Sequence, residues 1–316
     1  MLDKLLDFSM VKTYSLKERC NKMVFSRDAS AAVVPGMTVA SLLAAMPRQL
    51  GAESLLKVID AVVSAREKGK PVVMAIGGHV IKCGLQPVLK SLVDAGAVTA
   101  FAMNGSVSVH DYELSLIAET SEDVGAALHC GTFGMSEETG RDINRSLKEG
   151  VTKGLGYGES IGRFILENKN PYAEISLLAL CAERNIPATV HVAIGNDIIH
   201  QHPAADGAVI GEASFRDFRL LTAIVSQLGD GGVYLNIGSA VILPEVFLKA
   251  LSIAQNLGHH VDNFTTANFD MQQHYRPLQN VVKRPTSGHS QGYSITGHHE
   301  IMIPLLAAGI LDRMGV

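Results

Sequence analysis

Two pairs of nearby histidines and carboxylates could carry out acid–base chemistry in this 316-residue chain. His110 is followed directly by Asp111, and Asp197 lies three residues before His200. A histidine changes its protonation state near neutral pH, so it can accept a proton from a substrate amine or hydroxyl group. We expect His110 or His200 to accept that proton. Asp111 and Asp197 would hold a cationic group, although Asp111 could equally cap a helix and leave His110 exposed.

A further histidine group near the C-terminus raises the alternative of a metal-dependent hydrolase or lyase. His298 and Glu300 are catalytic candidates there, with Glu300 as another carboxylate for a cation. The candidate metal ligands are His200, His202, His298, His299 and Glu300. The sequence contains no HExxH motif or other ligand spacing of known mechanism, so we assign no metal site. His191 falls within a predicted strand, where we expect its side chain to be buried.

Composition and charge limit the classes of protein to consider. Hydrophobic residues make up 47% of the chain and charged residues 18%, the balance of a folded protein with a large core. The net charge of −4 comes without a basic tract, so we expect no nucleic-acid partner. The apolar run 301–311 is shorter than the roughly 20 residues that cross a membrane. Four scattered cysteines, without a CxxC pair, predict a cytoplasmic protein.

Short apolar runs alternate with segments of helical periodicity, and this alternation defines the predicted fold. The expected strands are 72–76, 98–103, 189–194, 233–237 and 261–266. The expected helices lie within 38–69, 84–95, 171–184, 215–228 and 244–257. The pattern predicts an α/β Rossmann-like fold, with a doubly wound, mostly parallel sheet and helices on both faces. We expect residues 1–36 to form a peripheral arm and residues 37–316 a single domain with helical additions.

Glycines, small polar residues and titratable residues follow every predicted strand. In a parallel sheet these loops meet at one edge, which is where ligands bind. Turns alone need such residues, but five loops of this kind at one edge favour a site. The loop residues are Gly77, Gly78, His79, Asn104, Gly105, Ser106, Gly238, Ser239, Thr266 and Asp270, and the loop 195–202 adds Asp197 and His200.

The glycines from Gly154 to Gly162 half resemble a dinucleotide-binding fingerprint. That fingerprint acts only between a strand and a helix, and no apolar strand precedes these glycines. We therefore expect a flexible turn and the start of a helix at this point.

Several short motifs between roughly residues 71 and 312 are similar to those of one known family. The motifs are Ile81-Lys82-Cys83-Gly84, Asn104-Gly105-Ser106, the segments 161–171 and 184–187, Gly232 to Val241, and Thr266-Ala267 with Phe269-Asp270. Together they resemble deoxyhypusine synthase and its bacterial relatives. That family has a Rossmann-like fold, forms a homotetramer, and holds NAD at subunit interfaces while it oxidises spermidine. The resemblance implies a homotetramer here and NAD bound by the loop residues from Gly77 to Asp270 named above.

The chain departs from that family where the family's own chemistry is done. The family transfers an aminobutyl group through a lysine that follows Trp-Gly, whereas this chain has no tryptophan and reads Asn-Val-Val-Lys-Arg-Pro-Thr at 280–286. Lys283 is the only nearby amine and stays a candidate for imine formation, which requires a placed and activated lysine. Ile242-Leu243-Pro244 stands where the family has Lys-His-His. The resemblance thus implies the scaffold without the family's catalytic set.

The leading interpretation is an NAD-dependent enzyme that acts on a small amine or an amino-acid-derived substrate, rather than on a protein lysine. Two alternatives stay open, namely the metal-dependent hydrolase or lyase and a non-catalytic nucleotide-binding protein. The expected partners are a small-molecule substrate and further copies of the same chain, with no nucleic acid and no membrane.

Overall fold

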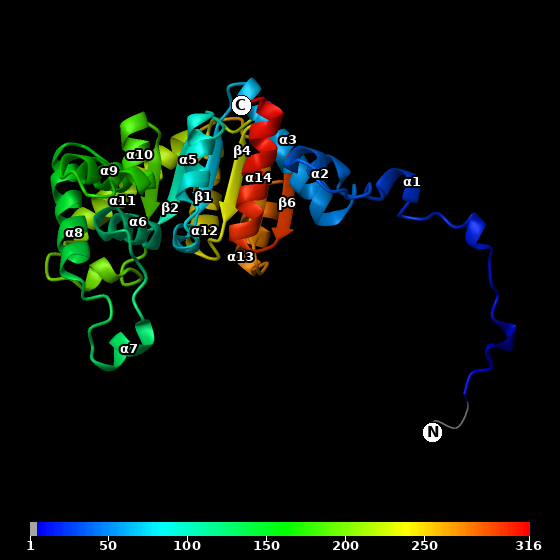
Figure 1. Cartoon of the computed structure of the whole chain (residues 1–316), viewed down its shortest axis with the longest axis horizontal. Helices are drawn as coiled ribbons and strands as arrows, with labels where there is room; N and C mark the ends of the chain where they lie inside the picture. The colour runs from blue at the N-terminus through cyan, green and yellow to red at the C-terminus, as the bar shows by residue number, and fades with distance from the viewer. Residues whose placement is uncertain (1–4) are drawn as a thin grey trace.

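The computed structural model describes residues 5–316, and a six-stranded parallel sheet forms its centre (Figure 1). The strands are β1 (Val72–Ile76), β2 (Ala100–Asn104), β3 (Ala188–His191), β4 (Val233–Ile237), β5 (Thr265–Asp270) and β6 (Gln291–Thr296). They lie in the order β3-β2-β1-β4-β5-β6, and each neighbouring pair is parallel. This is the strand order of the doubly wound dinucleotide-binding fold, so the predicted fold class is confirmed.

Helices cover both faces of the sheet. The first face carries α3 (Leu50–Glu67), α5 (Gln86–Asp94) and α14 (His299–Met314), and toward β3 it carries α6 (Gly105–Ile117), α9 (Tyr157–Glu167) and α10 (Leu177–Arg184). The second face carries α11 (Gly207–Val225) and α12 (Ile242–Asn256). The remaining helices are α1 (Phe25–Asp28), α2 (Val39–Ala45), α4 (Gly78–Lys82), α7 (Val124–His129), α8 (Glu137–Thr152) and α13 (Tyr275–Pro277).

Five short segments of tighter or wider helix complete the connections. They are η1 (Phe8–Met10), η2 (Leu16–Glu18), η3 (Ala173–Ile175), η4 (Ile198–Gln201) and the π-helical η5 (Leu278–Lys283).

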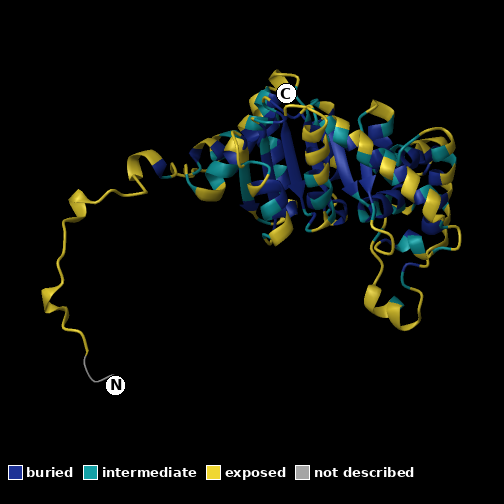
Figure 2. Ribbon diagram, turned by 180° about the vertical axis from the view of Figure 1, so that it is seen from behind, coloured by how far each residue is buried: buried dark blue, intermediate teal, exposed yellow. Residues whose placement is uncertain are grey.

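The core lies on both sides of β1, whose five residues are all buried. Val72, Met74 and Ile76 join the apolar cluster under the first layer of helices, and Val73 and Ala75 join the cluster under the second. A continuous apolar run is what a strand with both faces covered requires, because its side chains alternate between the two layers. Figure 2 shows these buried strands between half-exposed helices.

The strand predictions hold best at the centre of the sheet. The strands expected at 72–76 and 233–237 are confirmed to the residue, and the second and third are displaced by a few residues. The fifth strand was expected at 261–266 and instead runs from Thr265 to Asp270. Its polar interior is compatible with burial because the Asn268 side chain accepts a hydrogen bond from Asn236 and donates one to Gln273. The half-exposed edge strand β6 was missed.

Three expectations about the starts and lengths of helices are also resolved. Gly105 and Ser106 were expected in a loop after the second strand, but α6 begins directly at Gly105 and places both of them, with His110 and Asp111, within the helix. Asn104 makes this early start possible, since its side-chain oxygen accepts a hydrogen bond from the Val107 amide and caps the helix. The helix expected after the glycines at 154–158 is confirmed as α9. The single helix expected at 84–95 is shorter, as α5, and follows a separate α4.

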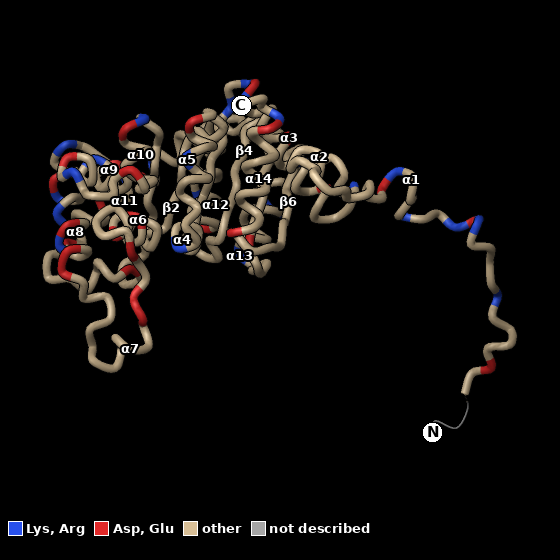
Figure 3. Tube along the Cα trace, in the orientation of Figure 1, with Lys and Arg blue, Asp and Glu red and all other residues tan. Residues whose placement is uncertain are grey.

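An extended arm precedes the domain. From Leu5 to Phe25 the chain is exposed throughout, and it runs away from the body of the molecule (Figure 1). Charged residues are sparse over the centre of the sheet and denser on the arm and around α8 to α10 (Figure 3). No helix within residues 5–316 combines the length and apolar character that crossing a membrane requires.

Close packing of α9 on α10 leads to a first prediction. A Cβ at Gly162 would overlap the Leu178 carbonyl oxygen and lie 2.9 Å from Ala182 Cβ. We expect Gly162→Ala to lower the free energy of unfolding by about 1–3 kcal/mol, because the two helices must move apart. Gly211→Ala is the control, since nothing lies within 4 Å of that position in α11, and it should stabilise by up to about 1 kcal/mol. Urea denaturation measures both, and equal effects would contradict the close packing.

Candidate functional site

The switch point of the sheet lies between the carboxyl ends of β1 and β4. The chain leaves β1 toward the first helical layer and leaves β4 toward the second, so a crevice opens between them. A Cβ at Gly77 would overlap the carbonyl oxygen of Gly238, and Gly238 itself has a φ of +69°. Both positions therefore need glycine, and the polypeptide backbone itself lines this crevice.

Histidines and carboxylates gather beside this switch point. His299, at the start of α14, is 2% exposed, and its Nε2 lies 2.6 Å from where a Cβ of Gly238 would be. Its Nδ1 is buried and has no hydrogen-bond partner among residues 5–316. The His79 and His299 ring centroids are 5.9 Å apart. Burial lowers the pKa of His299, which keeps the ring neutral and able to bind a polar ligand group.

Three more of the predicted residues lie at this end of the sheet. Asp270 is the last residue of β5 and is 7% exposed. Glu300 Oε1 lies 3.8 Å from His298 Nδ1, and Glu300 Oε2 lies 3.8 Å from the Cys83 sulfur. The structure thus brings together residues that follow β1, β4, β5 and β6.

A cleft of about 850 Å³ opens at the carboxyl ends of β2 and β3, on the same edge of the sheet. Its walls come from α4, α6, the loop 118–136, the start of α8 and the segment 196–198. The carboxylates that line it are Glu113, Glu119, Glu122, Glu138 and Asp197, and the only lysine or arginine among its lining residues is Lys82. A cleft with this charge balance attracts a cation.

Asp197 is the most perturbed carboxylate in the cleft wall. The residue is 6% exposed, and its Oδ2 has no hydrogen-bond partner within the described chain. Burial raises its pKa to about 6, because a desolvated carboxylate is costly to ionise. The Tyr157 hydroxyl is also buried and unpartnered in the described chain, and burial with the nearby Asp197 charge raises its pKa. A buried carboxyl group with one unpartnered oxygen in a cleft wall is a candidate for binding or proton transfer.

His110 lines the same cleft within a hydrogen-bond network. Its Nδ1 lies 2.7 Å from the Thr120 hydroxyl, which donates a hydrogen bond to Glu113 Oε2. The Thr139 hydroxyl donates to Glu113 Oε1 at 3.1 Å. On the other side, the ring Cδ2 of His110 lies 3.3 Å from where a Cβ of Gly78 would be. His110 therefore connects the cleft with the switch point.

Three predicted site residues do not join this group. Asp111 is fully buried, and its carboxylate accepts hydrogen bonds from the Ser176 hydroxyl and the amides of Leu177 and Leu178 at 2.5–3.0 Å. Asp111 thus anchors the start of α10. Thr266 lies at the amino end of β5 and donates to the Val281 carbonyl at 2.7 Å. Lys283 is exposed at the end of η5, and the residues that follow it lead to the amino end of β6.

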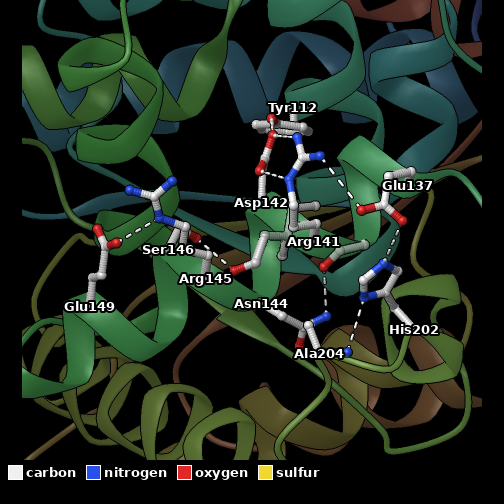
Figure 4. A network of polar contacts seen from close by, with 12 residues as sticks. Tyr112, Glu137, Arg141, Asp142, Asn144, Arg145, Ser146, Glu149, His202 and Ala204 are labelled. Carbon is white, nitrogen blue, oxygen red and sulfur yellow. Dashed lines mark hydrogen bonds and ion pairs between the residues drawn. The ribbon is translucent and has the colours of Figure 1, made fainter.

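His200 and His202 are held by structural hydrogen bonds. His200 Nδ1 accepts from the amides of Gly195 and Asp197, and burial lowers the pKa of His200. His202 accepts from the Ala204 amide at 3.1 Å and lies 3.4 Å from Glu137, in the network around α8 shown in Figure 4. Within the part of the chain that the structure describes, no three His, Cys, Asp or Glu side chains are arranged to hold a metal. His191 is 3% exposed in β3, as expected.

The remaining predicted residues shape the loops. Asn104 caps α6 and accepts from the Ser106 hydroxyl at 2.9 Å, and Ser106 lines the cleft. Gly105 packs directly against the Asp197 carboxylate. Ser239 is buried, and its hydroxyl accepts from the Leu243 amide at 3.2 Å at the start of α12.

Glu113 and Thr120 were missed by the sequence analysis. Glu113 lies three residues after His110, so the spacing would have pointed to it once both were placed on one helix. No sequence signal identifies Thr120, which reaches His110 only through the course of the loop after α6.

The fold and these features define a doubly wound α/β protein with a glycine-lined switch point and an adjoining acidic cleft. No protein-family model matches the chain, and no curated protein matches it. The comparison with solved structures, in contrast, finds the same fold in several proteins of low sequence identity.

Three of these solved structures are informative. The complex of AgrE with ornithine and NAD+ gives a TM-score of 0.53 at 14% identity, over 82% of this chain and 32% of AgrE. A candidate LOR/SDH protein from Methanococcus maripaludis S2 gives 0.52 at 13% identity, over 90% of this chain and 73% of its own. A candidate deoxyhypusine synthase from Entamoeba histolytica gives 0.50 at 10% identity, over 93% and 97%. The deoxyhypusine synthase-like fold is confirmed, and this chain spans about a third of AgrE.

The raised pKa of Asp197 leads to a prediction on stability. In an unfolded chain the carboxyl group titrates near 3.8, and in the folded chain near 6, so the folded state loses stability as the pH rises through this interval. We expect Asp197→Asn to raise the free energy of unfolding above pH 6, by up to about 3 kcal/mol, and the gain to shrink as the pH falls toward 4. Urea unfolding at four pH values tests this, with the exposed Glu183→Gln as control. A gain independent of pH would refute it.

Proposed function

We propose that the protein is an NAD-dependent enzyme that acts on a small amine or an amino-acid-derived cationic substrate. The observation that carries the proposal is the position of the acidic cleft directly beside the glycine-lined switch point. A cofactor at the switch point and a cation in the cleft would lie on either side of His110. Support also comes from AgrE, which shares the fold and was crystallised with both ornithine and NAD+.

The residues at the switch point fit a dinucleotide. The strand order creates the crevice, and the bare backbones at Gly77 and Gly238 allow close approach. Buried His299 Nδ1 and Asn236 Oδ1 have no hydrogen-bond partners within residues 5–316. Asn236 Oδ1 could accept a hydrogen bond from a bound ligand, and His299 Nδ1 could accept or donate one. NAD, when bound, supplies the chemistry of accepting a hydride.

The residues of the chain would then divide the remaining tasks. His110 would accept the proton released from the substrate amine or hydroxyl group. Glu119, Glu122 and Glu138 would attract the cationic group to the cleft, and Asp197 would hold it at the inner wall. Within residues 5–316, no cluster of three His, Cys, Asp or Glu side chains supports a metal-dependent reaction.

Cofactor binding provides the first test of the function. NAD+ should raise the melting temperature of the full chain, because a ligand that binds the folded state stabilises it. We expect His79→Ala, an exposed residue at the start of α4, to weaken NAD+ binding about tenfold in calorimetry, equivalent to about 1.4 kcal/mol. His259→Ala is the matched control, because this exposed histidine lies in a separate pocket with Arg284 and Pro285. Absence of any response to NAD+ would exclude the proposal.

Charge selection in the cleft provides the second test. Ornithine and spermidine should bind the NAD-loaded protein more tightly than succinate does. We expect Glu138→Gln to weaken amine binding about two- to fivefold, which is the size of an exposed charge interaction. The control is Glu137→Gln, since Glu137 belongs to the same turn of α8 but faces Arg141 and His202 instead of the cleft. Equal effects of the two variants would contradict the assignment of the cleft.

A further inference from the structure

We propose that Glu113 acts through Thr120 to fix the tautomer of His110, so that Nε2 of His110 is the proton-accepting atom of the cleft. The inference rests on the function proposed above, because it assigns a chemical state to the residue that would take the substrate proton. Glu113 and Thr120 are positioning residues in this scheme, since each acts through the imidazole ring.

The first step of the argument is that Glu113 is ionised. Its side chain is 18% exposed, and burial alone would raise its pKa. The nearby His110 ring and hydrogen bonds from the Thr120 and Thr139 hydroxyls outweigh burial and hold the pKa of Glu113 below its ordinary value. An ionised carboxylate only accepts hydrogen bonds, so every group that contacts Glu113 must donate to it.

The second step follows from the single proton of the Thr120 hydroxyl. That proton is donated to Glu113 Oε2, so the Thr120 oxygen can only accept from the histidine ring. His110 Nδ1 lies 2.7 Å from this oxygen and therefore carries the ring proton. In a neutral imidazole the other nitrogen then has a free lone pair, which places the basic atom of His110 at Nε2.

The third step is the direction in which Nε2 faces. No group within residues 5–316 forms a hydrogen bond with this atom. The His110 side chain is 14% exposed. The adjacent ring atom Cδ2 points to Gly78 at the switch point, 3.3 Å from its Cβ position. The free lone pair therefore faces the region between the proposed cofactor and the cleft.

The charges around His110 support proton acceptance. Glu113 Oε2 lies 3.8 Å from Nδ1, where it stabilises the imidazolium that forms after proton transfer. The other charged groups that line the cleft come from the neighbouring elements. They are Lys82 of α4, Glu119 and Glu122 of the loop, Glu138 of α8 and Asp197 before η4.

The backbone around Thr120 shows that its position is enforced. Ala118 and Ser121, on either side of Thr120, have φ values of +57° and +76°. Each costs about 1 kcal/mol or more in a residue other than glycine, so surrounding contacts must hold the loop in place. One such contact is the hydrogen bond of 2.7 Å from the Gly134 amide to Glu122, which joins the two ends of the loop.

The test is the tautomer of His110, measured by nuclear magnetic resonance on the full chain labelled with ¹⁵N-histidine, without NAD or amine. The His110 signals are assigned with His110→Gln. We expect a ring protonated at Nδ1 in the wild type. Thr120→Val should reduce the ratio of the Nδ1-protonated to the Nε2-protonated form by about fivefold or more, because the variant loses the hydrogen bond that stabilises the Nδ1-protonated form. Thr120→Ser keeps the hydroxyl and should restore the wild-type ratio.

Further variants separate the proposal from a general effect of the loop. Thr132→Val removes another hydroxyl of the same loop, one that donates to Ala127, and should leave the His110 tautomer unchanged. Glu113→Gln should shift the ratio in the same direction as Thr120→Val. A ring protonated at Nε2 in the wild type, or an unchanged ratio in Thr120→Val, would overturn the proposal. The tautomer is measured without a ligand, so the tautomer proposal can fail while NAD and amine binding are confirmed. Equally, the predicted tautomer can be found in a protein that binds neither NAD nor an amine.

Discussion

The Gly238 carbonyl occupies the space that a side chain on Gly77 would need, and the geometry at the carboxyl end of the sheet depends on this contact. Two parallel strands that carry their helices to opposite faces must separate at their carboxyl ends. Here the two backbones stay close at the point of separation. The crevice is therefore lined by peptide groups, and larger side chains, such as His79 and His299, stand at its rim. A ligand bound in this crevice would meet the fixed dipoles of peptide groups rather than long, mobile side chains.

Neighbouring residues of helix α6 face in different directions. Asp111 points into the core and anchors α10, whereas His110 and Glu113, three residues apart, face the cleft. The buried anchor limits rotation of the helix, because any turn of α6 would separate the Asp111 carboxylate from three donors. The same constraint fixes the direction of the His110 ring. A residue that never meets a ligand thus determines the geometry of one that would.

The sequence predicted the features that depend on local composition. The apolar runs of β1 and β4 mark central strands because both of their faces are buried, and glycines mark the switch point because nothing larger fits. The features that the sequence did not predict depend on contacts between residues far apart in the chain. Asn268 lies in a buried strand because Asn236 donates a hydrogen bond to its side chain, and Asp270 belongs to the strand because it pairs with Thr296 of β6. Asp111 and Thr266 are polar residues of the types found in binding sites. Their hydrogen bonds to α10 and to the Val281 carbonyl, however, hold them away from the cleft.

The loop that carries Thr120 also has a consequence for how the site could respond to its surroundings. His110 belongs to a helix anchored in the core, whereas its hydrogen-bond partner belongs to an excursion that returns to the body only at α8. In the proposed arrangement, the tautomer of His110 therefore depends on the position of this loop as well as on the helix that carries the ring.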